Sequence, residues 1–248
     1  MSKEIVIAGA GWLGGPLARV LKESYKHVTV LSRSDEQFAF FKSQHISLIK
    51  VDYSQIEQSI INSETTKTLI ICIPPVPNYC SIINGLVKAI NPSHIIFTSA
   101  TSVYSQTSGE VTETSTLGGN PLLEEAETLI INSGVLYSIL RLGGLIGEDR
   151  NPSSHFSGKR DISNGGAPVN LIHREDIIQI ITQVIDKNIQ GIFNIVYPSH
   201  PTRKEYYEKQ CVQRGLAPCE FDSNGNGKIV NGSKISDILN RPYRFSIE

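Results

Sequence analysis

Three glycines near the start of the chain have a spacing that suits phosphate binding. The stretch GAGWLG places Gly9, Gly11 and Gly14 in a G-x-G-x-x-G pattern, between an apolar run and a helix-like segment. The first glycine permits a sharp turn, the second lets a pyrophosphate approach the backbone, and the third lets a helix pack against a strand. We therefore predict a dinucleotide site in which Trp12 and Leu13 also contact the nucleotide. The alternative is a tight turn that binds nothing.

The end of the second expected strand indicates which dinucleotide the site prefers. NAD sites usually place an acidic residue there, for the ribose 2′-hydroxyl. This chain instead has Ser32, Arg33 and Ser34. An arginine flanked by hydroxyls suits a 2′-phosphate through charge-assisted hydrogen bonds. The pattern predicts NADP over NAD, and the alternative is that Arg33 is an ordinary solvated charge.

Two further strand ends complete the predicted cofactor site. Asp52 ends the third strand and is expected either to bond the adenine amino group or to cap a helix. Ile73, Pro74 and Pro75 end the fourth strand, where a rigid turn would line the pocket of the nicotinamide ribose.

The elements that must position these residues follow a strand–helix alternation. Apolar runs predict strands at 4–9, 27–32, 48–52, 68–75, 94–100, 137–144 and 191–198. Amphipathic segments predict helices at 12–25, 79–91, 122–134, 170–187 and 202–215. Such alternation predicts an α/β fold, a Rossmann-type doubly wound parallel sheet with a small C-terminal substrate cap. The predicted nucleotide-binding domain spans 1–145 and 167–197, and the cap spans 146–166, read as a loop, and 198–248.

Composition excludes several classes of function. The formal net charge is −1, so no basic field would attract nucleic acid. The chain enters a strand almost at once, and no run approaches 18 apolar residues, which predicts a cytoplasmic protein without a membrane span. The four cysteines and six histidines match no zinc pattern, so we predict no metal site and idle thiols.

Several segments together resemble the short-chain dehydrogenase/reductase superfamily, near its atypical and NAD(P)-dependent epimerase/dehydratase branch. They are GAGWLGGPLARVL, FTSATSVYSQTSGEVTETS, ILRLGGLIGEDR, NLIHREDIIQIITQVI and GIFNIVYP, in the family's order. The resemblance implies a Rossmann domain with a small-molecule substrate under a C-terminal cap, and a homodimer built through helices that flank the sheet.

The family's usual catalyst is a serine or threonine with a Y-x-x-x-K pair, and this chain lacks that pair. None of its nine tyrosines has a lysine four residues later. Tyr137 and Arg141 come nearest, but on a strand they would lie about 13 Å apart. Aligning Ala126 and Glu127 with the family places Gly119 at the tyrosine position and Leu123 at the lysine position.

Replacement residues are nevertheless present after the fifth strand. Tyr104 is the candidate proton donor, with Thr101 or Ser99 orienting a substrate oxygen, and the alternative for Tyr104 is a packed aromatic. In the loop, His155, Lys159 and Arg160 could act as an acid or anion clamp, or be solvated. His173 and Asp176 are expected to cap a helix and to bond each other.

Three functions remain open. The first is an NADP-dependent oxidoreductase acting on a small or sugar-nucleotide-like metabolite, with other catalytic residues or with an imine substrate that needs no enzyme acid. The second is a non-catalytic NADP-binding redox sensor or regulatory protein. The third is a sugar-nucleotide epimerase/dehydratase, which would need a general base for its reversible oxidation.

Overall fold

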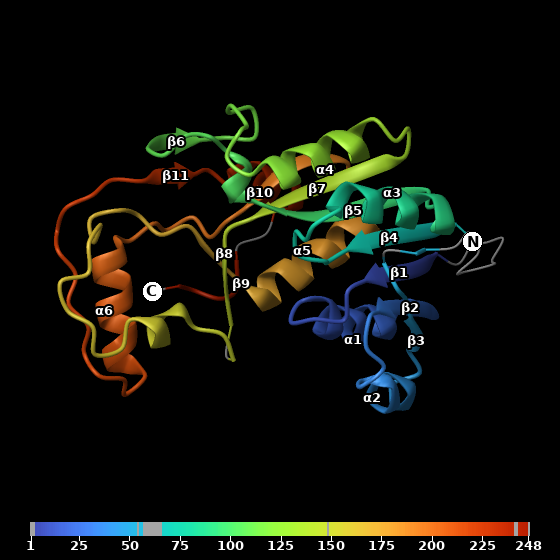
Figure 1. Ribbon diagram of the computed structural model, residues 1–248, viewed down its shortest axis with the longest axis horizontal. Helices are drawn as coiled ribbons and strands as arrows, with labels where there is room; N and C mark the ends of the chain where they lie inside the picture. The colour runs from blue at the N-terminus through green and yellow to red at the C-terminus, as the bar shows by residue number, and fades with distance from the viewer. Residues whose placement is uncertain (1–2, 54, 57–65, 148, 241–242, 248) are drawn as a thin grey trace. The chain divides into compact units, whose positions relative to one another are not determined.

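Seven parallel strands form the central sheet, in the order β10-β7-β5-β4-β1-β2-β3 (Figure 1). The computed structural model describes residues 3–53, 55–56, 66–147, 149–240 and 243–247. The strands are β1 (Glu4–Ala8), β2 (His27–Ser32), β3 (Ser47–Lys50), β4 (Lys67–Ile71), β5 (His94–Ala100), β7 (Leu136–Leu142) and β10 (Gly191–Ile195). Every residue of β1 and β4 is buried, as expected for parallel strands covered on both faces. The predicted Rossmann-type sheet is confirmed.

The register of the sheet brings three strand ends to one edge. Ala8, at the end of β1, lies opposite Leu31 of β2 and Ile71 of β4. The residues that follow these strands therefore emerge next to one another. This is where open parallel sheets bind ligands, outside the carboxyl ends of their strands.

Helices cover both faces of this part of the sheet. Figure 1 shows α3 (Tyr79–Ile90) and α4 (Pro121–Ile131) together on one face, and α1 (Gly14–Ser24) on the other. Helix α1 buries Leu17, Ala18 and Leu21, the stripe that its apolar spacing predicts. A short helix, α2 (Phe38–Ser43), follows β2 and was not predicted, because six residues carry little periodicity.

The chain divides into two compact units. The first comprises 1–99, 120–140 and 178–192, and the second comprises 100–119, 141–177 and 193–248. The domain boundaries predicted above stay a prediction. The second unit holds the smaller elements: η1 (Thr101–Val103), β6 (Gly109–Val111), β8 (Gly144–Ile146), η2 (Pro152–His155), β9 (Leu171–His173), α6 (Arg203–Gln213), β11 (Lys228–Val230) and α7 (Ser233–Leu239), with α5 (Arg174–Asp186) crossing the boundary.

Two short parallel ladders organise the second unit. β6 pairs with β11, from Gly109 opposite Lys228 to Val111 opposite Val230 (Figure 1). β8 pairs with β9, so the predicted helix over 170–187 was wrong at its start. Residues 171–173 are a strand, and α5 begins only at Arg174. Part of the predicted loop 146–166 is likewise ordered, as the last residue of β8 and as η2.

The second unit has an aromatic core of its own. Helix α6 starts with a capping box, in which Thr202 accepts from the backbone of Glu205 and Glu205 accepts from the backbone of Thr202. The helix then buries Tyr206 and Tyr207, which pack with Phe221 and other apolar residues. This packing explains why the C-terminal region folds despite its polar and glycine-rich sequence.

Three further observations concern the chemistry of the described residues. Among them no helix combines the length and the apolar character that crossing a bilayer requires. They also contain no group of three or more His, Cys, Asp or Glu side chains suited to a metal ion. The four cysteines are free thiols, although Cys211 and Cys219 are buried with their Sγ atoms 3.3 Å apart.

Candidate functional site

The turn after β1 depends on two glycines that cannot carry a side chain. Gly9 has φ +108°, and a Cβ there would lie 3.0 Å from the carbonyl oxygen of Cys72. A Cβ on Gly14 would lie 2.0 Å from the carbonyl oxygen of Gly9. The N–H of Gly9 also donates to Leu31 O at 2.9 Å. These contacts hold β1, β2 and the start of α1 close together, which is the role that the glycine pattern predicts.

Gly11 differs, because it faces open space. A Cβ there would meet nothing within 4 Å, and the residue lines a cavity of about 580 Å³. The cavity lies at the N-terminus of α1, where no side chain caps the first turn. A helix N-terminus beside an open, side-chain-free backbone is the arrangement that receives a phosphate. The residues present therefore fit the pyrophosphate of a dinucleotide.

The loop after β2 forms another wall of this cavity. Ser32 Oγ accepts from the N–H of Ser34 at 3.2 Å, and Ser34 Oγ accepts from the N–H of Glu36 at 3.1 Å. These two local bonds set the course of the loop. Arg33 is exposed between them and lines the cavity together with Glu36 and Gln37. A cation and an anion thus both face the region where an adenosine ribose would lie in this fold.

Seven of the twelve predicted cofactor residues line the cavity: Gly9, Gly11, Ser32, Arg33, Ser34, Ile73 and Pro74. The other five lie outside its lining: Trp12, Leu13, Gly14, Asp52 and Pro75. Leu13 is buried at the N-cap of α1, and Asp52 is exposed with its carbonyl accepting from the N–H of Gln55. The structure thus gathers the predicted residues of three strand ends around one cavity. A cofactor contact for each residue stays a prediction.

Five lining residues of the cavity were not predicted from the sequence, and two of them, Tyr53 and Cys72, carry groups that could titrate deep in its wall. The hydroxyl of Tyr53 donates to Leu31 O at 2.8 Å, and burial raises the pKa of that phenol. Burial also raises the pKa of the Cys72 thiol to about 12. At neutral pH the Tyr53 phenol and the Cys72 thiol are therefore uncharged lining groups of the cavity rather than reactive ones. Their positions gave a signal, since Tyr53 follows Asp52 and Cys72 precedes Ile73.

The hydroxyl of the candidate catalytic residue Ser99 is hydrogen-bonded to a buried carboxyl group. Its hydroxyl donates to Glu127 Oε1 at 2.6 Å, and both residues are buried. Glu127 lies on α4 and belongs to the same compact unit as Ser99. The pair joins the end of β5 to the helix that covers it. A catalytic role for Ser99 stays a prediction.

Tyr104 lies in the second unit, and its hydroxyl both donates and accepts a hydrogen bond. It is 2% exposed, donates to Asn194 Oδ1 at 2.6 Å and accepts from Arg141 Nη1 at 2.9 Å. Burial raises the pKa of Tyr104, although the bond from Arg141 opposes that effect. To give its proton to a substrate, the hydroxyl would have to leave Asn194. This geometry favours the packed-aromatic alternative, and the partnership with Arg141 was not foreseen.

The backbone explains why the family's tyrosine is missing. A Cβ on Gly119 would lie 2.3 Å from Ser102 O and 2.4 Å from Tyr104 O. The N–H of Gly119 donates to Val103 O at 2.9 Å, which holds residue 119 close to the segment after β5. No side chain fits at residue 119, so neither tyrosine nor any other donor can occupy the aligned position. Thr101, the remaining candidate, is buried at the start of η1.

The loop candidates sit mainly at the surface. Lys159 Nζ lies 3.5 Å from His155 Nε2, and exposed Arg160 lies 3.9 Å from Glu220. None of these three residues lines the glycine-turn cavity or a cavity of about 490 Å³ that residues of the second unit such as Tyr197 and Ile229 line. Their use as acid or clamp stays a prediction.

His173 and Asp176 stabilise the start of α5, but not as a pair. His173 Nδ1 accepts from the N–H of Glu175 at 3.2 Å, which is the expected capping role. Asp176 accepts instead from the backbone N–H groups of Arg244 and Phe245. The buried Asp176 therefore anchors the C-terminal segment, and Phe245 stacks on His173 with ring centroids 4.2 Å apart.

Comparison with known proteins identifies the family. The model of the NAD(P)H-binding family matches residues 9–188. The chain belongs to this family. The *Escherichia coli* K12 protein YeeZ is 32% identical over 265 aligned residues, which cover 98% of this chain and 96% of YeeZ. The NAD(P)-binding family that the motifs predicted is thereby confirmed.

Several solved structures have the same fold as this chain. UDP-glucuronic acid 4-epimerase from *Bacillus cereus*, solved with NAD, has a TM-score of 0.81 at 19% identity, covering 98% of this chain and 94% of its own. A functionally unknown conserved protein from *Silicibacter pomeroyi* has a TM-score of 0.80 at 19% identity, covering 99% and 94%. This NAD(P)H-binding chain therefore has the architecture of epimerase/dehydratase-like proteins.

Proposed function

We propose that this chain is an NADP-dependent oxidoreductase that acts on a small or sugar-nucleotide-like metabolite. The single observation that carries the proposal is the cavity around Gly11, with Arg33 on its wall. When bound, the nicotinamide would supply or accept a hydride. The protein would hold the pyrophosphate at the glycine turn and the extra phosphate at Arg33.

Arg33 supports NADP over NAD for an electrostatic reason. Its exposed guanidinium can turn toward a 2′-phosphate, and Ser32 and Ser34 offer hydroxyls beside it. Glu36 on the same wall would repel a phosphate at close range. The proposal therefore requires Arg33 to lie nearer the 2′-position than Glu36 when the nucleotide binds.

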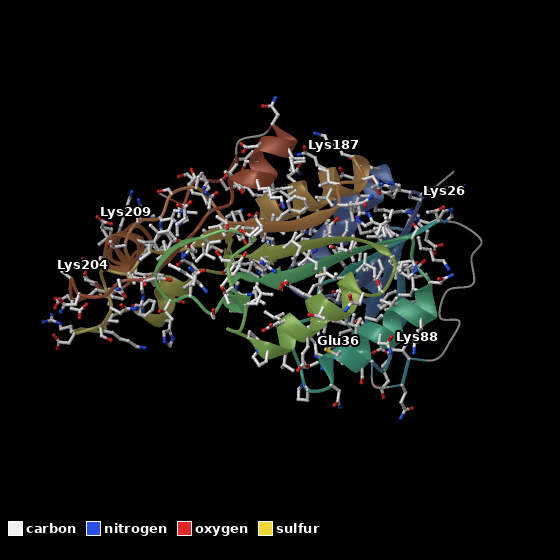
Figure 2. All side chains as sticks on the ribbon, turned by 90° about the horizontal axis from the view of Figure 1, so that it is seen from above. Lys26, Glu36, Lys88, Lys187, Lys204 and Lys209 are labelled. Carbon is white, nitrogen blue, oxygen red and sulfur yellow. The ribbon has the colours of Figure 1, made fainter. Side chains whose placement is uncertain are left out.

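A calorimetric titration tests the cofactor half of the proposal. We expect Arg33→Ala to weaken NADP⁺ binding by about 10- to 100-fold, the range of a hydrogen bond to a charged group, and to leave NAD⁺ binding nearly unchanged. Lys88→Ala removes the same charge from α3, an exposed position outside the cavity lining (Figure 2). That control should leave both affinities unchanged. Equal losses for NADP⁺ and NAD⁺ in Arg33→Ala would contradict a 2′-phosphate role.

An assay of hydride transfer then distinguishes the enzyme hypothesis from the sensor hypothesis. A second candidate, the non-catalytic redox sensor, is favoured by the engaged hydroxyl of Tyr104 and by the closed position at Gly119. NADPH oxidation is followed with a panel of aldehydes, ketones and preformed imines. Turnover of any member supports the oxidoreductase, with faster turnover of imines favouring a substrate that needs no enzyme acid. Binding of NADPH without turnover favours the sensor.

The relatives bear on the substrate only as an analogy. The *B. cereus* epimerase acts on a UDP-sugar, and MoeE5 was solved with UDP-glucose and NAD. Nucleotide sugars therefore belong in the substrate panel. An epimerase remains the third candidate, because reversible oxidation of a hydroxyl needs a base, and Tyr104 is held by two partners.

A further inference from the structure

The second compact unit contains a cavity of its own, with a volume of about 490 Å³. That volume is typical of small-molecule sites. Every described residue that lines it belongs to this unit, and none of them also lines the cavity around Gly11. Glu110 of β6 and Ile229 of β11, which lie opposite each other in the ladder, both line it (Figure 1). The cavity is therefore a separate candidate site within one unit.

Two tyrosine rings form a corner of this cavity. Tyr197 and Tyr243 both line it, with ring centroids 5.8 Å apart and ring planes at 58°. The N–H of Tyr197 donates to Leu171 O at 2.8 Å, and Asp176 accepts from the backbone just after Tyr243. A flat base stacked between two rings would need parallel rings about 7 Å apart, twice the usual contact distance. Rings that touch at an angle suit a rounded group instead.

The charge at this tyrosine corner is negative. Among the described lining residues, Glu110 is the only carboxylate, and none is lysine or arginine. Glu110 is exposed, and its Oε1 accepts from Asn231 Nδ2 at 2.8 Å. Burial raises the pKa of Tyr243, and the carboxylates of Asp176 and Glu113 raise it further, against an opposing hydrogen bond. Three carboxylates thus act on the corner.

The cations that adjoin lining residues in sequence do not cancel this charge. Lys228 donates to Thr101 O at 2.8 Å, and Lys234 Nζ lies 4.9 Å from the centroid of the Phe193 ring. The exposed Arg244 is not among the lining residues. The two lysines are therefore directed at other groups of the same unit.

We propose that the tyrosine corner binds the substituted ammonium group of a small organic cation. The face of a tyrosine ring is negative and attracts a cation that lies within about 6 Å of the ring centroid. The methyl groups of such an ammonium are rounded and apolar, so they gain contact with the rings while Glu110 balances the charge. Ser233 and Ser236, which also line the cavity, offer hydroxyls to the polar part of the ligand. This site goes beyond the proposed oxidoreductase function.

Calorimetry with choline tests whether the site requires a positive charge. The comparison ligand is its neutral isostere dimethylbutanol, in which carbon replaces the nitrogen. We expect choline to bind the wild-type protein about 10-fold more tightly than the isostere. Equal affinities, or no saturable heat with choline up to about 100 mM, overturn the proposal. The titration needs neither NADPH nor turnover, so its failure and that of the oxidoreductase function are separate results.

Variants then locate the bound cation. Glu110→Gln keeps the acceptor for Asn231 and should weaken choline binding by about 2- to 5-fold without affecting the isostere. Tyr197→Leu should weaken choline binding by about 10-fold, whereas Tyr197→Phe keeps the ring and should bind like the wild type. Glu23→Gln removes the same charge from an exposed position of α1 in the other unit and should change nothing.

Thermal unfolding shows whether the Tyr197 variants fold, because that ring packs partly against the aromatic core of the unit. Glu110 is exposed, so its variant remains informative in either case. A wild-type affinity for choline in Glu110→Gln overturns the proposal even if Tyr197→Leu does not fold. A folded Tyr197→Leu protein that binds choline like the wild type overturns it as well.

Discussion

A methyl group added at Gly11 should raise stability and weaken cofactor binding at the same time. A Cβ at this position meets no atom within 4 Å, and the residue does not require a positive φ. Gly11→Ala should therefore stabilise the apoprotein by about 0.4–1 kcal/mol, because alanine has less freedom in the unfolded chain. For a chain of this length that corresponds to a melting temperature higher by about 1–3 °C. The methyl group projects into the cavity where we propose that the pyrophosphate binds, so NADPH affinity should fall by at least about 10-fold.

The matched variant Gly14→Ala should lower both the stability of the apoprotein and its affinity for NADPH. Its Cβ would lie 2.0 Å from Gly9 O, so α1 must move away from β1 at a cost of about 1–3 kcal/mol. Thermal unfolding of the two apoproteins and calorimetry with NADPH measure both effects. If Gly11→Ala bound NADPH like the wild type, the cavity would not be the pyrophosphate site, and the argument from the glycine turn would fail.

Two further predictions concern buried groups away from that cavity. Burial lowers the pKa of His94 from 6.5 to about 4, so its stabilising contribution of about 3 kcal/mol is present above pH 6.5 and lost as the pH falls toward 4. Urea unfolding at a series of pH values should show this loss, and His94→Gln should flatten the curve; an unchanged curve would contradict a buried neutral histidine. Tyr104→Phe should lower the free energy of unfolding by about 1–3 kcal/mol, because Arg141 and Asn194 lose a buried partner, and should leave NADPH affinity unchanged. A large loss of turnover with unchanged stability would instead restore Tyr104 as the catalytic acid.

The sheet was predictable because its strands are continuous apolar runs. The predicted strand 94–100 coincides with β5, and the predicted strand 4–9 exceeds β1 by one residue. The three-residue strands β6, β8, β9 and β11 were missed, since so few residues show no period. The start of α5 was misplaced for a related reason. Leu171 and Ile172 continue its apolar pattern, yet β8 recruits them into a ladder.

The residues around the glycine-turn cavity were also largely predictable, whereas the network around Tyr104 was not. The glycine pattern and the strand ends are local in sequence, and the parallel register brings them together. Arg141 and Lys228, by contrast, lie 37 and 124 residues from Tyr104. Contacts of this kind depend on the path of the whole chain, and no spacing rule within one segment encodes them.

The closed position at Gly119 and the placement of Lys228 are consequences of one backbone turn. The carbonyl oxygens of Ser102 and Tyr104 point at Gly119, which leaves no room for a side chain. Carbonyl oxygens of the same segment also attract the ammonium of Lys228. A tyrosine introduced at residue 119 would therefore have to move both carbonyls, and one of them, Tyr104 O, is also an acceptor of Lys228. In this chain the closed position at residue 119 and the binding of the Lys228 ammonium therefore depend on the same course of the backbone between residues 101 and 104.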